Sequence, residues 1–466
     1  MDDPSVTKLS RADWQGTQPT MPEGRQKEAP QVAVDEREWM TSFDPTTDSL
    51  LGNVQGSEVY ADGMPASGAD NGLTLATLRG VPYDDERWNS LLDQVDWDAE
   101  KSDVQELLFM SNYHTRVIKS VGKPATKDRD GAMGWGGTQS AGASSWASAN
   151  LLASTWNCDL MRQMGRAIGE ESLHFGFTGW YAPAVNTHRS AFGGRVYEYF
   201  SEDGLLAGKL AAAQIGGAGD KGVISYLKHF ALNEQETNRA GNLATWATEQ
   251  TVREIYLRPF QIALQDARSD VRYLDESGAA QQRTICTGTG VMAAQSNVGC
   301  VTGCAHHGLL TSVLRDEWGF DGAVVSDLSV AGSTEHDLIL RAGCDMWLAG
   351  FIGSASDYDS ATARTVMRES LHRICYAVAN SNAMNGIAPG AKVSQGTAGW
   401  KAGVTAGTVA VVGALAAGWV FYARKRRNNP DTSFEDKKAR KAAKKQARRD
   451  KKAQRKGKHA AKQDAD

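Results

Sequence analysis

Cysteine is scarce in this chain of 466 residues. The six cysteines are Cys158, Cys286, Cys300, Cys304, Cys344 and Cys375. So few thiols in a chain of this length exclude a small scaffold held together by disulfides. The run from Cys300 to His307 holds two cysteines and two histidines, but its spacing matches no zinc pattern. Buried thiols beside a loop are the simpler interpretation, and no metal site is predicted.

A secretory signal is also missing from the sequence. The first residues, MDDPSVTKLSRADW, contain neither a basic segment nor an apolar core, so we expect no signal peptide in this chain. Residues 1–80 are polar, rich in Pro, Gly, Asp and Thr, and poor in apolar runs. This composition predicts an extended amino-terminal connecting segment rather than an independent domain.

The body of the chain lacks an excess of basic residues. Residues 424–466 hold 18 Lys/Arg against 6 Asp/Glu, a net charge of +12. The whole chain carries a net charge of -4, so the remaining residues carry -16. An acidic body argues against nucleic acid as its ligand, whereas the basic tail suits RNA or anionic lipid.

Short apolar runs alternate with amphipathic helical patterns between residues 81 and 385. We expect strands at 174–183, 223–230, 286–293, 321–326 and 343–348. We expect helices at 148–169, 201–213, 248–266, 306–317 and 360–380. This alternation predicts an α/β fold with a parallel sheet. Its length favours a TIM-type (β/α)8 barrel over an open sheet.

An uncharged segment follows the predicted barrel. Residues 386–402 are a Gly/Ala/Ser-rich linker, and residues 403–423 contain no charged side chain. A stretch of this length can cross a bilayer as a helix, although its many Ala and Gly residues leave a buried globular helix as an alternative. Trp419 and Tyr422 lie at one end of it, directly before the basic block. This order predicts a transmembrane helix with a barrel outside the cytoplasm and a cytoplasmic tail at 424–466 that contacts anionic lipid, with RNA the less favoured ligand.

Clusters of polar residues follow several apolar runs of the predicted barrel. They are residues 128–131, residues 186–198, residues 226–236 and residues 323–329. In a barrel such positions lie at the carboxyl ends of strands, where binding sites form. Their carboxylates, cationic groups and amides suit a neutral polyol, and Trp135 and Trp180 would offer stacking faces.

Each cluster alone also has a structural interpretation. Asp130 before glycine is typical of a turn. Arg189 and Arg195 could form structural salt bridges, and Lys228 with His229 could be surface residues. Asp327 could cap the helix that follows it. Their order on successive strand–helix units is what favours a shared site.

Several longer motifs resemble the family 3 glycoside hydrolases of the β-glucosidase type. These motifs are GGRVYEYFSEDGLLAG, KHFALNEQETNR, LRDEWGF and GFDGAVVSDLSV. The resemblance covers about residues 81–385 and implies the (β/α)8 barrel of that family. It also implies a carbohydrate substrate and no cofactor, because the reaction needs only carboxylates and water.

The resemblance assigns roles to single residues. Asp327, in the VVSD motif, stands where the family has its catalytic nucleophile. The hydroxyl-binding residues of the sugar site correspond to Asp130, Arg195, Lys228 and His229. Two positions depart from the family pattern: Leu328 replaces a frequent Trp, and Gln295 replaces a frequent Tyr. These departures place substrate preference in doubt, but not the resemblance.

The second catalytic group of a retaining glycosidase, the acid/base, has no obvious counterpart here. One branch of the family uses a His in a KHFPGHG loop, whereas this chain has KHFALNE. The β-glucosidase branch takes a Glu from a separate sandwich domain, which no segment after residue 385 resembles. The chain therefore resembles the carboxyl-terminal part of a permuted member, with a separate domain or chain supplying the acid/base. Glu234 or Glu236 is the alternative within this chain.

The leading hypothesis is a membrane-anchored glycosidase that hydrolyses β-glucosides or related sugars with retention. Two alternatives stay open. A non-catalytic carbohydrate-binding barrel would remain if the acid/base domain were lost. A membrane-surface adaptor would act through its basic tail.

Overall fold

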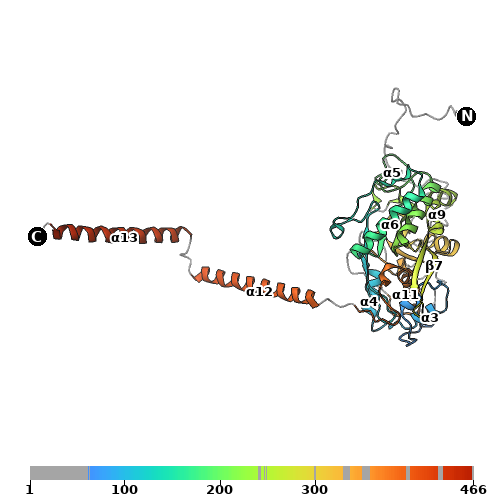
Figure 1. The fold of residues 1–466 in the computed structure, drawn as a ribbon, viewed down its shortest axis with the longest axis horizontal. Coiled ribbons are helices and arrows are strands. Elements are labelled where there is room, and N and C mark those ends of the chain that lie inside the picture. The colour runs from blue at the N-terminus through green and yellow to red at the C-terminus, as the bar shows by residue number, and fades with distance from the viewer. Residues whose placement is uncertain are drawn as a thin grey trace, which may run out of the picture. The chain divides into compact units, whose positions relative to one another are not determined.

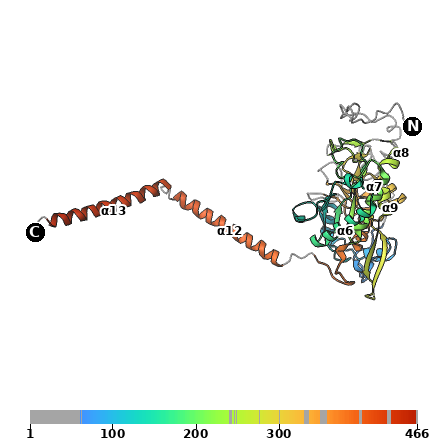
Figure 2. The same cartoon turned by 45° about the horizontal axis from the view of Figure 1, so that its top comes forward.

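The computed structural model describes eleven segments of the chain: residues 61, 63–239, 243–245, 247, 249–275, 277–298, 301–328, 336–348, 357–394, 399–428 and 434–463. The chain divides into two units, Met1–Gln395 and Gly396–Asp466. The first holds the sheets and most of the helices, and the second is formed by two long helices (Figures 1 and 2). The predicted sheet and its site lie in the first unit.

The main sheet has six strands in the order β1-β2-β3-β4-β8-β11. They are β1 (His114–Thr115), β2 (Thr126–Asp130), β3 (Gly179–Tyr181), β4 (Ile224–Phe230), β8 (Gly290–Ala293) and β11 (Ala323–Ser326). Strands β2 to β11 pair in parallel, and β1 is antiparallel to β2. A bridge from Val325 to Met346 adds one more parallel step.

The structure confirms the predicted parallel α/β sheet, but it does not show the predicted closed barrel. Within the residues that the structure describes, the sheet runs from β1 to the Met346 bridge and stays open. The TIM-type barrel is thus present as a partial, curled sheet rather than as eight paired strands. The segments 329–335 and 349–356, which flank the last bridge, lie outside the described residues.

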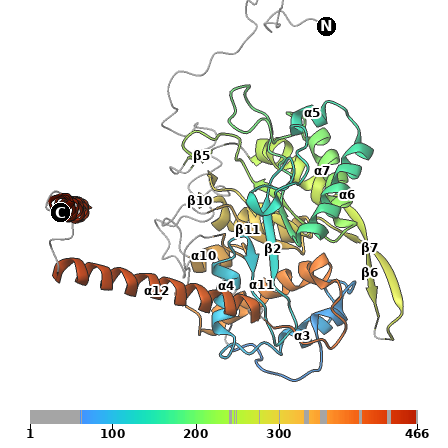
Figure 3. The same ribbon diagram turned by 60° about the vertical axis from the view of Figure 1, so that its left-hand side comes forward.

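Two smaller sheets accompany the main one. Strands β6 (Arg268–Leu274) and β7 (Ala280–Cys286) form an antiparallel hairpin, which projects at the edge of the unit in Figure 3. Strands β5 (Ala244–Thr245), β9 (Asn297–Val298) and β10 (Val301–Thr302) form a short three-stranded sheet.

Helices cover the sheet. In the first unit they are α3 (Arg87–Leu92), α4 (Lys101–Phe109), α5 (Ala149–Ala153), α6 (Cys158–Phe175), α7 (Gly204–Gly219), α8 (Glu249–Thr251), α9 (Arg258–Asp266), α10 (His336–Arg341) and α11 (Ala361–Ala379). Short 3-10 turns occur at Leu75–Leu78, Thr138–Ser140, Gly303–Ala305 and Asn382–Met384, and π-helical segments at Val252–Tyr256 and Gly308–Glu317.

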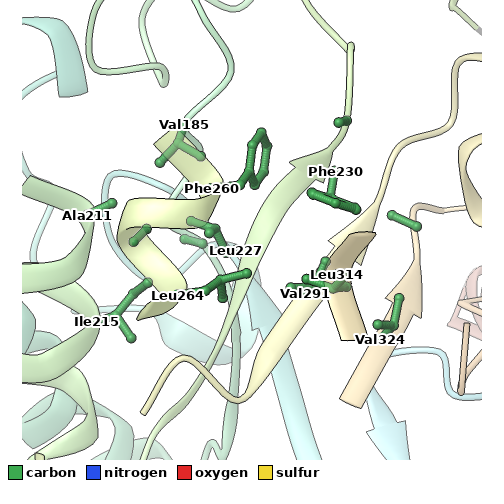
Figure 4. Close-up of a cluster of buried hydrophobic side chains, with 14 of the residues drawn as sticks. Val185, Ala211, Ile215, Leu227, Phe230, Phe260, Leu264, Val291, Leu314 and Val324 are labelled. Atoms are coloured by element: carbon green, nitrogen blue, oxygen red, sulfur yellow. The ribbon is translucent and has the colours of Figure 1, made fainter. Parts of the chain in front are cut away.

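Alternate residues of the strands pack into two different apolar clusters. Leu227, Val291 and Val324 contact the cluster that contains Phe260 and Leu264 of α9, together with Ala211 and Ile215 of α7 (Figure 4). The neighbouring residues Tyr226, Met292 and Val325 belong to a second cluster that includes side chains of α3, α4 and α11. Because successive strand residues point to opposite faces, both faces of the sheet are buried.

Several predicted boundaries differ from the structure. The helix expected at 148–169 is two helices, because Trp156 has a positive φ of 53° and Asn157 caps α6 by accepting a hydrogen bond from the Leu160 amide. Of the strand expected at 174–183, only Gly179–Tyr181 is extended, because α6 continues to Phe175 and ends at Gly176 in a left-handed conformation. The β6–β7 hairpin was not predicted.

The predicted boundary at residue 80 also lies too late in the chain. Leu75 and Leu78 form a turn of 3-10 helix and have no exposed surface. They belong to the cluster that contains α3 and α11. The packed core of the first unit therefore begins before the expected start of the barrel.

The second unit consists of α12 (Gly399–Asn428) and α13 (Phe434–Gln463). Within α12, Gly403–Lys425 forms 23 residues with a mean hydropathy of 1.8, long and apolar enough to cross a membrane. This helix includes the predicted span 403–423. Length and composition alone support a membrane role for it.

Candidate active site

Four of the five predicted site residues lie at the carboxyl ends of parallel strands of the main sheet, and Arg195 lies in the segment between β3 and α7. Asp130 is the last residue of β2, Lys228 and His229 lie near the end of β4, and Asp327 directly follows β11. Because these strands are parallel, their carboxyl ends meet at one edge of the sheet. Strand β4 is buried along its whole length, so Lys228 and His229 are a charged and a polar group in a buried strand.

The Asp327 carboxylate is held from several directions. Its backbone amide donates to the Ala293 carbonyl at 3.0 Å, which fixes the residue beside the end of β8. Arg239 Nη1 donates to Oδ2 at 2.5 Å, and the Leu328 amide donates to Oδ1 at 2.6 Å. The side chain is only 11% exposed. A carboxylate with both oxygens engaged has a defined orientation, as a nucleophile needs.

His229 lies next to Asp327 as a neutral ring. Its Nε2 is 3.8 Å from Asp327 Oδ2 and accepts a hydrogen bond from Arg195 Nη1 at 3.0 Å. Burial holds the pKa of His229 well below its usual value, and the charges of Lys228, Arg195 and Arg239 lower it further. With Nε2 as acceptor, the proton belongs on Nδ1, which is 3.4 Å from the Tyr199 hydroxyl. His229 therefore supplies polarity beside Asp327 without a charge.

The other predicted residues form one ionic network. Lys228 Nζ donates to Asp130 Oδ1 at 2.7 Å and lies 3.7 Å from Glu198 Oε2. Arg195 Nη1 donates to Glu198 Oε1 at 3.0 Å, and its Nε donates to Glu236 Oε2 at 2.8 Å. The Asp130 side chain remains 52% exposed, so it is free to accept hydrogen bonds from a ligand as well.

A cavity of about 730 Å³ opens beside this network. Its lining includes Asp130, Arg195, Glu198 and Lys228, together with the glycine-rich loop 131–137. Gly131 has a φ of +137° and lies against the backbone of Gly134 and Gly136, so a larger residue would not fit in this loop. The volume lies within the range of small-molecule pockets. Alternating acceptors and donors on its wall match the hydroxyl groups of a polyol.

Four residues of this network were not predicted as site residues. Arg239 binds Asp327, Glu198 joins Arg195 to Lys228, and Tyr199 contacts His229. Asn186 accepts from the His229 amide at 2.7 Å and donates to its carbonyl. Glu198 and Arg239 lie inside the quoted GGRVYEYF and KHFALNEQETNR motifs, but nothing in their spacing shows which side chains they meet.

Both aromatic residues expected as stacking faces are largely buried, although Trp135 is still among the residues that line the cavity. Trp180 has no exposed surface and donates its indole proton to the Gly131 carbonyl. Trp135 is 6% exposed and donates to the Ile168 carbonyl. Stacking by Trp180 was therefore a wrong prediction, because the indole packs inside the first apolar cluster. Arg189 lies over the Tyr256 ring, in a structural contact.

Neither Glu234 nor Glu236 is placed as an obvious acid for Asp327. Burial raises the pKa of Glu234 to about 7, but its carboxyl accepts from Asn186 and faces Thr187 and Arg189. Glu236 accepts from Arg195 Nε and lies 3.2 Å from Arg239 Nε, a partnership typical of a carboxylate rather than of a proton donor.

The structure offers no arrangement for a metal among the residues that it describes: no group of three or more His, Cys, Asp or Glu is suitably placed. Cys304 is buried, and this burial raises the pKa of its thiol to about 11. Cys300 lies outside the described residues.

Residues 100–351 match the glycosyl hydrolase family 3 N terminal domain, which is more than half of the chain. The chain belongs to this family. Beta-glucosidase A of Butyrivibrio fibrisolvens is 38% identical over 231 residues, which are 49% of this chain and 25% of that protein. Beta-glucosidase B of Emericella nidulans is 36% identical over 241 residues, which are 51% of this chain and 26% of that protein.

A solved family 3 structure agrees with this assignment. β-Glucosidase 3B from Thermotoga neapolitana, in complex with glucose, is 28% identical with a TM-score of 0.53. The alignment covers 64% of this chain and 43% of that one. The shared α/β fold of TIM-barrel type explains why the polar clusters follow strand ends. The chain spans about a quarter of the length of the curated relatives it matches.

Proposed function

We propose that this family 3 chain hydrolyses the glycosidic bond of β-glucosides or closely related sugars through Asp327. The observation that carries the proposal is the position of the Asp327 carboxylate. It lies at a strand end, held by Arg239 and next to neutral His229. His229 in turn contacts Arg195, which lines the cavity of about 730 Å³ with Asp130 and Lys228.

The proposed reaction has two steps. Asp327 attacks the anomeric carbon, the aglycone leaves with its bonding electrons, and a covalent glycosyl-enzyme forms. Water then attacks the same carbon and releases Asp327, so the configuration is retained. Arg239 and the Leu328 amide keep the carboxylate aimed, while Asp130, Lys228 and Arg195 hold the sugar hydroxyl groups. Lys228 pairs with Asp130 and Arg195 pairs with Glu198, so these carboxylates are already oriented before the sugar binds.

The acid/base group is proposed to come from outside this chain. Glu234 and Glu236 face other partners, as described above, and the curated relatives are about four times longer than the matched segment. A separate domain or chain would then supply the carboxylic acid that protonates the aglycone. The carbohydrate-binding barrel without catalysis is the alternative when no such group is supplied.

Membrane attachment is proposed from α12. Its apolar stretch Gly403–Lys425 would span the bilayer. The basic residues of the tail would then lie at the cytoplasmic headgroups, with the first unit on the other side.

A mechanism-based label tests the nucleophile separately from the acid. The full chain in detergent would be incubated with 2,4-dinitrophenyl 2-deoxy-2-fluoro-β-glucoside, whose leaving group departs without a proton. We expect one adduct per chain by intact-mass spectrometry, on the peptide that contains Asp327. Asp327→Asn should give no adduct.

The matched control is Asp159→Asn, an exposed aspartate on α6. It should be labelled as fast as the unmodified chain. If the glucosyl reagent and its xylosyl and arabinosyl counterparts all fail to label the chain, the proposed nucleophile is wrong. Sugar binding without any label would then support the non-catalytic alternative.

A further inference from the structure

A second cavity lies at the other end of strand β4. It has a volume of about 490 Å³, and Gly219–Gly222, which precede β4, form part of its wall. Lys228 lies six residues further along the chain, roughly 20 Å away for an extended strand. The remaining wall comes from α6, from β6 of the projecting hairpin (Figure 3), from Arg79, and from Asn380 and Asn385 after α11. This cavity is separate from the candidate active site.

The wall of this second cavity is strongly cationic. Its basic side chains are Arg79, Arg162, Arg166, Lys221 and Arg272, and its only acidic ones are Asp220 and Asp270. The wall itself carries an excess of three positive charges, which Glu170, the partner of Lys221, reduces to two. This excess is notable because the body of the chain as a whole is acidic.

The acidic residues do not neutralise the wall. Asp220 is shared by two guanidinium groups, at 2.9 Å from Arg162 Nη2 and 2.8 Å from Arg166 Nε. Within the described part of the chain, Asp270 accepts only from the neutral side chains of Gln282 and Thr284. Lys221 is paired with Glu170, which is not part of the wall.

Two arginines of the wall contact neutral amides in place of carboxylates. Arg79 donates to Asn385 Oδ1 at 3.3 Å and 3.4 Å, and its buried Nε has no hydrogen-bond partner among the described residues. Burial also lowers the pKa of Arg79. Arg272 Nε donates to Gln282 Oε1 at 3.3 Å. A bound anion would supply the missing acceptors.

We propose that this cavity binds a phosphate monoester. A monoester carries a charge of about -1.5 to -2 at neutral pH and three strong acceptor oxygens. Those oxygens match the fork-shaped donors of Arg79 and Arg272, and the charge matches the excess on the wall. The volume leaves room for a small organic group beside the phosphate. A phosphodiester, with one charge and two free oxygens, fits less well.

Calorimetric titration of the full chain in detergent with glycerol 3-phosphate tests this site directly. We expect saturable one-to-one binding at 0.15 M salt. Arg79→Gln and Arg272→Gln should each weaken it about tenfold. Arg272 is exposed on the hairpin, so its variant keeps the test valid if Arg79→Gln fails to fold. Asp270→Asn removes a repelling charge and should tighten binding several-fold.

Two comparisons complete the test. Arg258→Gln, an exposed arginine on α9 outside this cavity, should bind glycerol 3-phosphate as the unmodified chain does. Glycerophosphoglycerol, a diester, should bind at least tenfold more weakly. The proposal fails if the unmodified chain does not bind the monoester, if the diester binds equally well, or if Arg258→Gln weakens binding as much as Arg272→Gln.

Discussion

At the scale of single residues, Asp327 depends on a neighbour that spacing did not reveal. Arg239 Nη1 lies 2.5 Å from Asp327 Oδ2, and the same guanidinium contacts Glu236 through Nε. The other polar neighbour, His229, is neutral because burial and three cations oppose its charge. Arg239 is therefore the charged group in direct contact with the proposed nucleophile.

Replacing Arg239 should slow formation of the covalent adduct. Arg239→Met removes the hydrogen bond and the charge, and we expect the labelling rate to fall about 100-fold, the size of effect that losing one preorganised electrostatic contact can have. Arg239→Lys keeps the positive charge but lacks the planar guanidinium group, so its labelling rate should fall less. The rate constant of labelling by the fluoroglucoside measures both. An unchanged rate in Arg239→Met would show that Arg239 has no role in aiming Asp327.

A histidine far from the site gives the protein a pH-dependent stability. His372, on α11, stacks on Tyr83 with ring centroids 4.0 Å apart, and its buried Nε2 has no partner among the described residues. Burial, reinforced by Arg373 and Arg368, lowers the pKa of His372 to about 4. In the unfolded chain its pKa is about 6.5, so below that pH the unfolded state binds the proton first.

His372→Phe should make the protein less sensitive to acid. His372 contributes no penalty above pH 6.5, and its penalty grows as the pH falls from 6.5 to 4, to about 3 kcal/mol. Phe keeps a ring against Tyr83 but cannot titrate. Urea unfolding at pH 7 and pH 5 should therefore show a smaller loss of unfolding free energy for His372→Phe. The exposed His174→Gln serves as a control and should follow the unmodified protein.

At the scale of elements, α6 and α7 approach each other through glycines. A Cβ on Gly165 of α6 would meet the Gln214 carbonyl, with the Ala218 amide at 2.9 Å. A Cβ on Gly217 of α7 would meet the Arg162 carbonyl in return. The neighbours are backbone atoms, which cannot rotate away. Both helices must therefore keep glycine where they cross.

Gly165→Ala should destabilise the protein although alanine favours helices. The gain in helix propensity is at most about 1 kcal/mol. The clash with a fixed carbonyl should outweigh it, for a net loss of about 1–3 kcal/mol in the free energy of unfolding. Gly63→Ala is the control, because no atom lies within 4 Å of its added Cβ. Equal stability of the two variants would contradict this account of the helix crossing.

At the scale of the whole molecule, the chain matches only part of the length of its family 3 relatives. The matched segment is about a quarter of each curated relative, and no acid is placed for Asp327 among the contacts described. A glycosidase without its acid still reacts when the leaving group needs no proton. The leaving group therefore tests the proposal that the acid comes from outside this chain.

The full chain alone should hydrolyse dinitrophenyl β-glucoside at least about 100-fold faster than phenyl β-glucoside. The reason is that general acid catalysis contributes about 100- to 10,000-fold, and only the phenyl compound needs it. Release of each phenol, followed by absorbance, measures the ratio. Similar rates for the two substrates would show that this chain contains its own acid, and Glu234→Gln and Glu236→Gln would then identify it.

The second unit should attach the chain to membranes through α12. Introducing two charges, as in Val412→Asp with Leu415→Asp, should abolish retention of the chain in vesicles after carbonate extraction, because each charge at the centre of a span costs about 3 kcal/mol. Lys437→Gln, in the basic tail, should be retained like the unmodified chain. Retention of the charged double variant would exclude α12 as the anchor.

The sequence by itself predicted the α/β alternation and the apolar span, and its motifs singled out Asp130, Arg195, Lys228, His229 and Asp327 as candidate site residues. These follow from local periodicity and from motifs that are contiguous in the chain. The break before α6 carried a local signal too, an Asn at the cap position, but the apolar pattern on both sides obscured it.

Only the tertiary structure decided which side chains meet. Trp180 became a core residue because its strand is buried on both faces, and Arg239 reached Asp327 across 88 positions of sequence. The cationic cavity is lined by residues that lie between Arg79 and Asn385 in the sequence. Taken one at a time, its charged residues resemble ordinary surface residues. Periodicity reports the face on which a residue lies, but distances between segments are set by how sheets and helices pack, and this is why the sites depend on the fold.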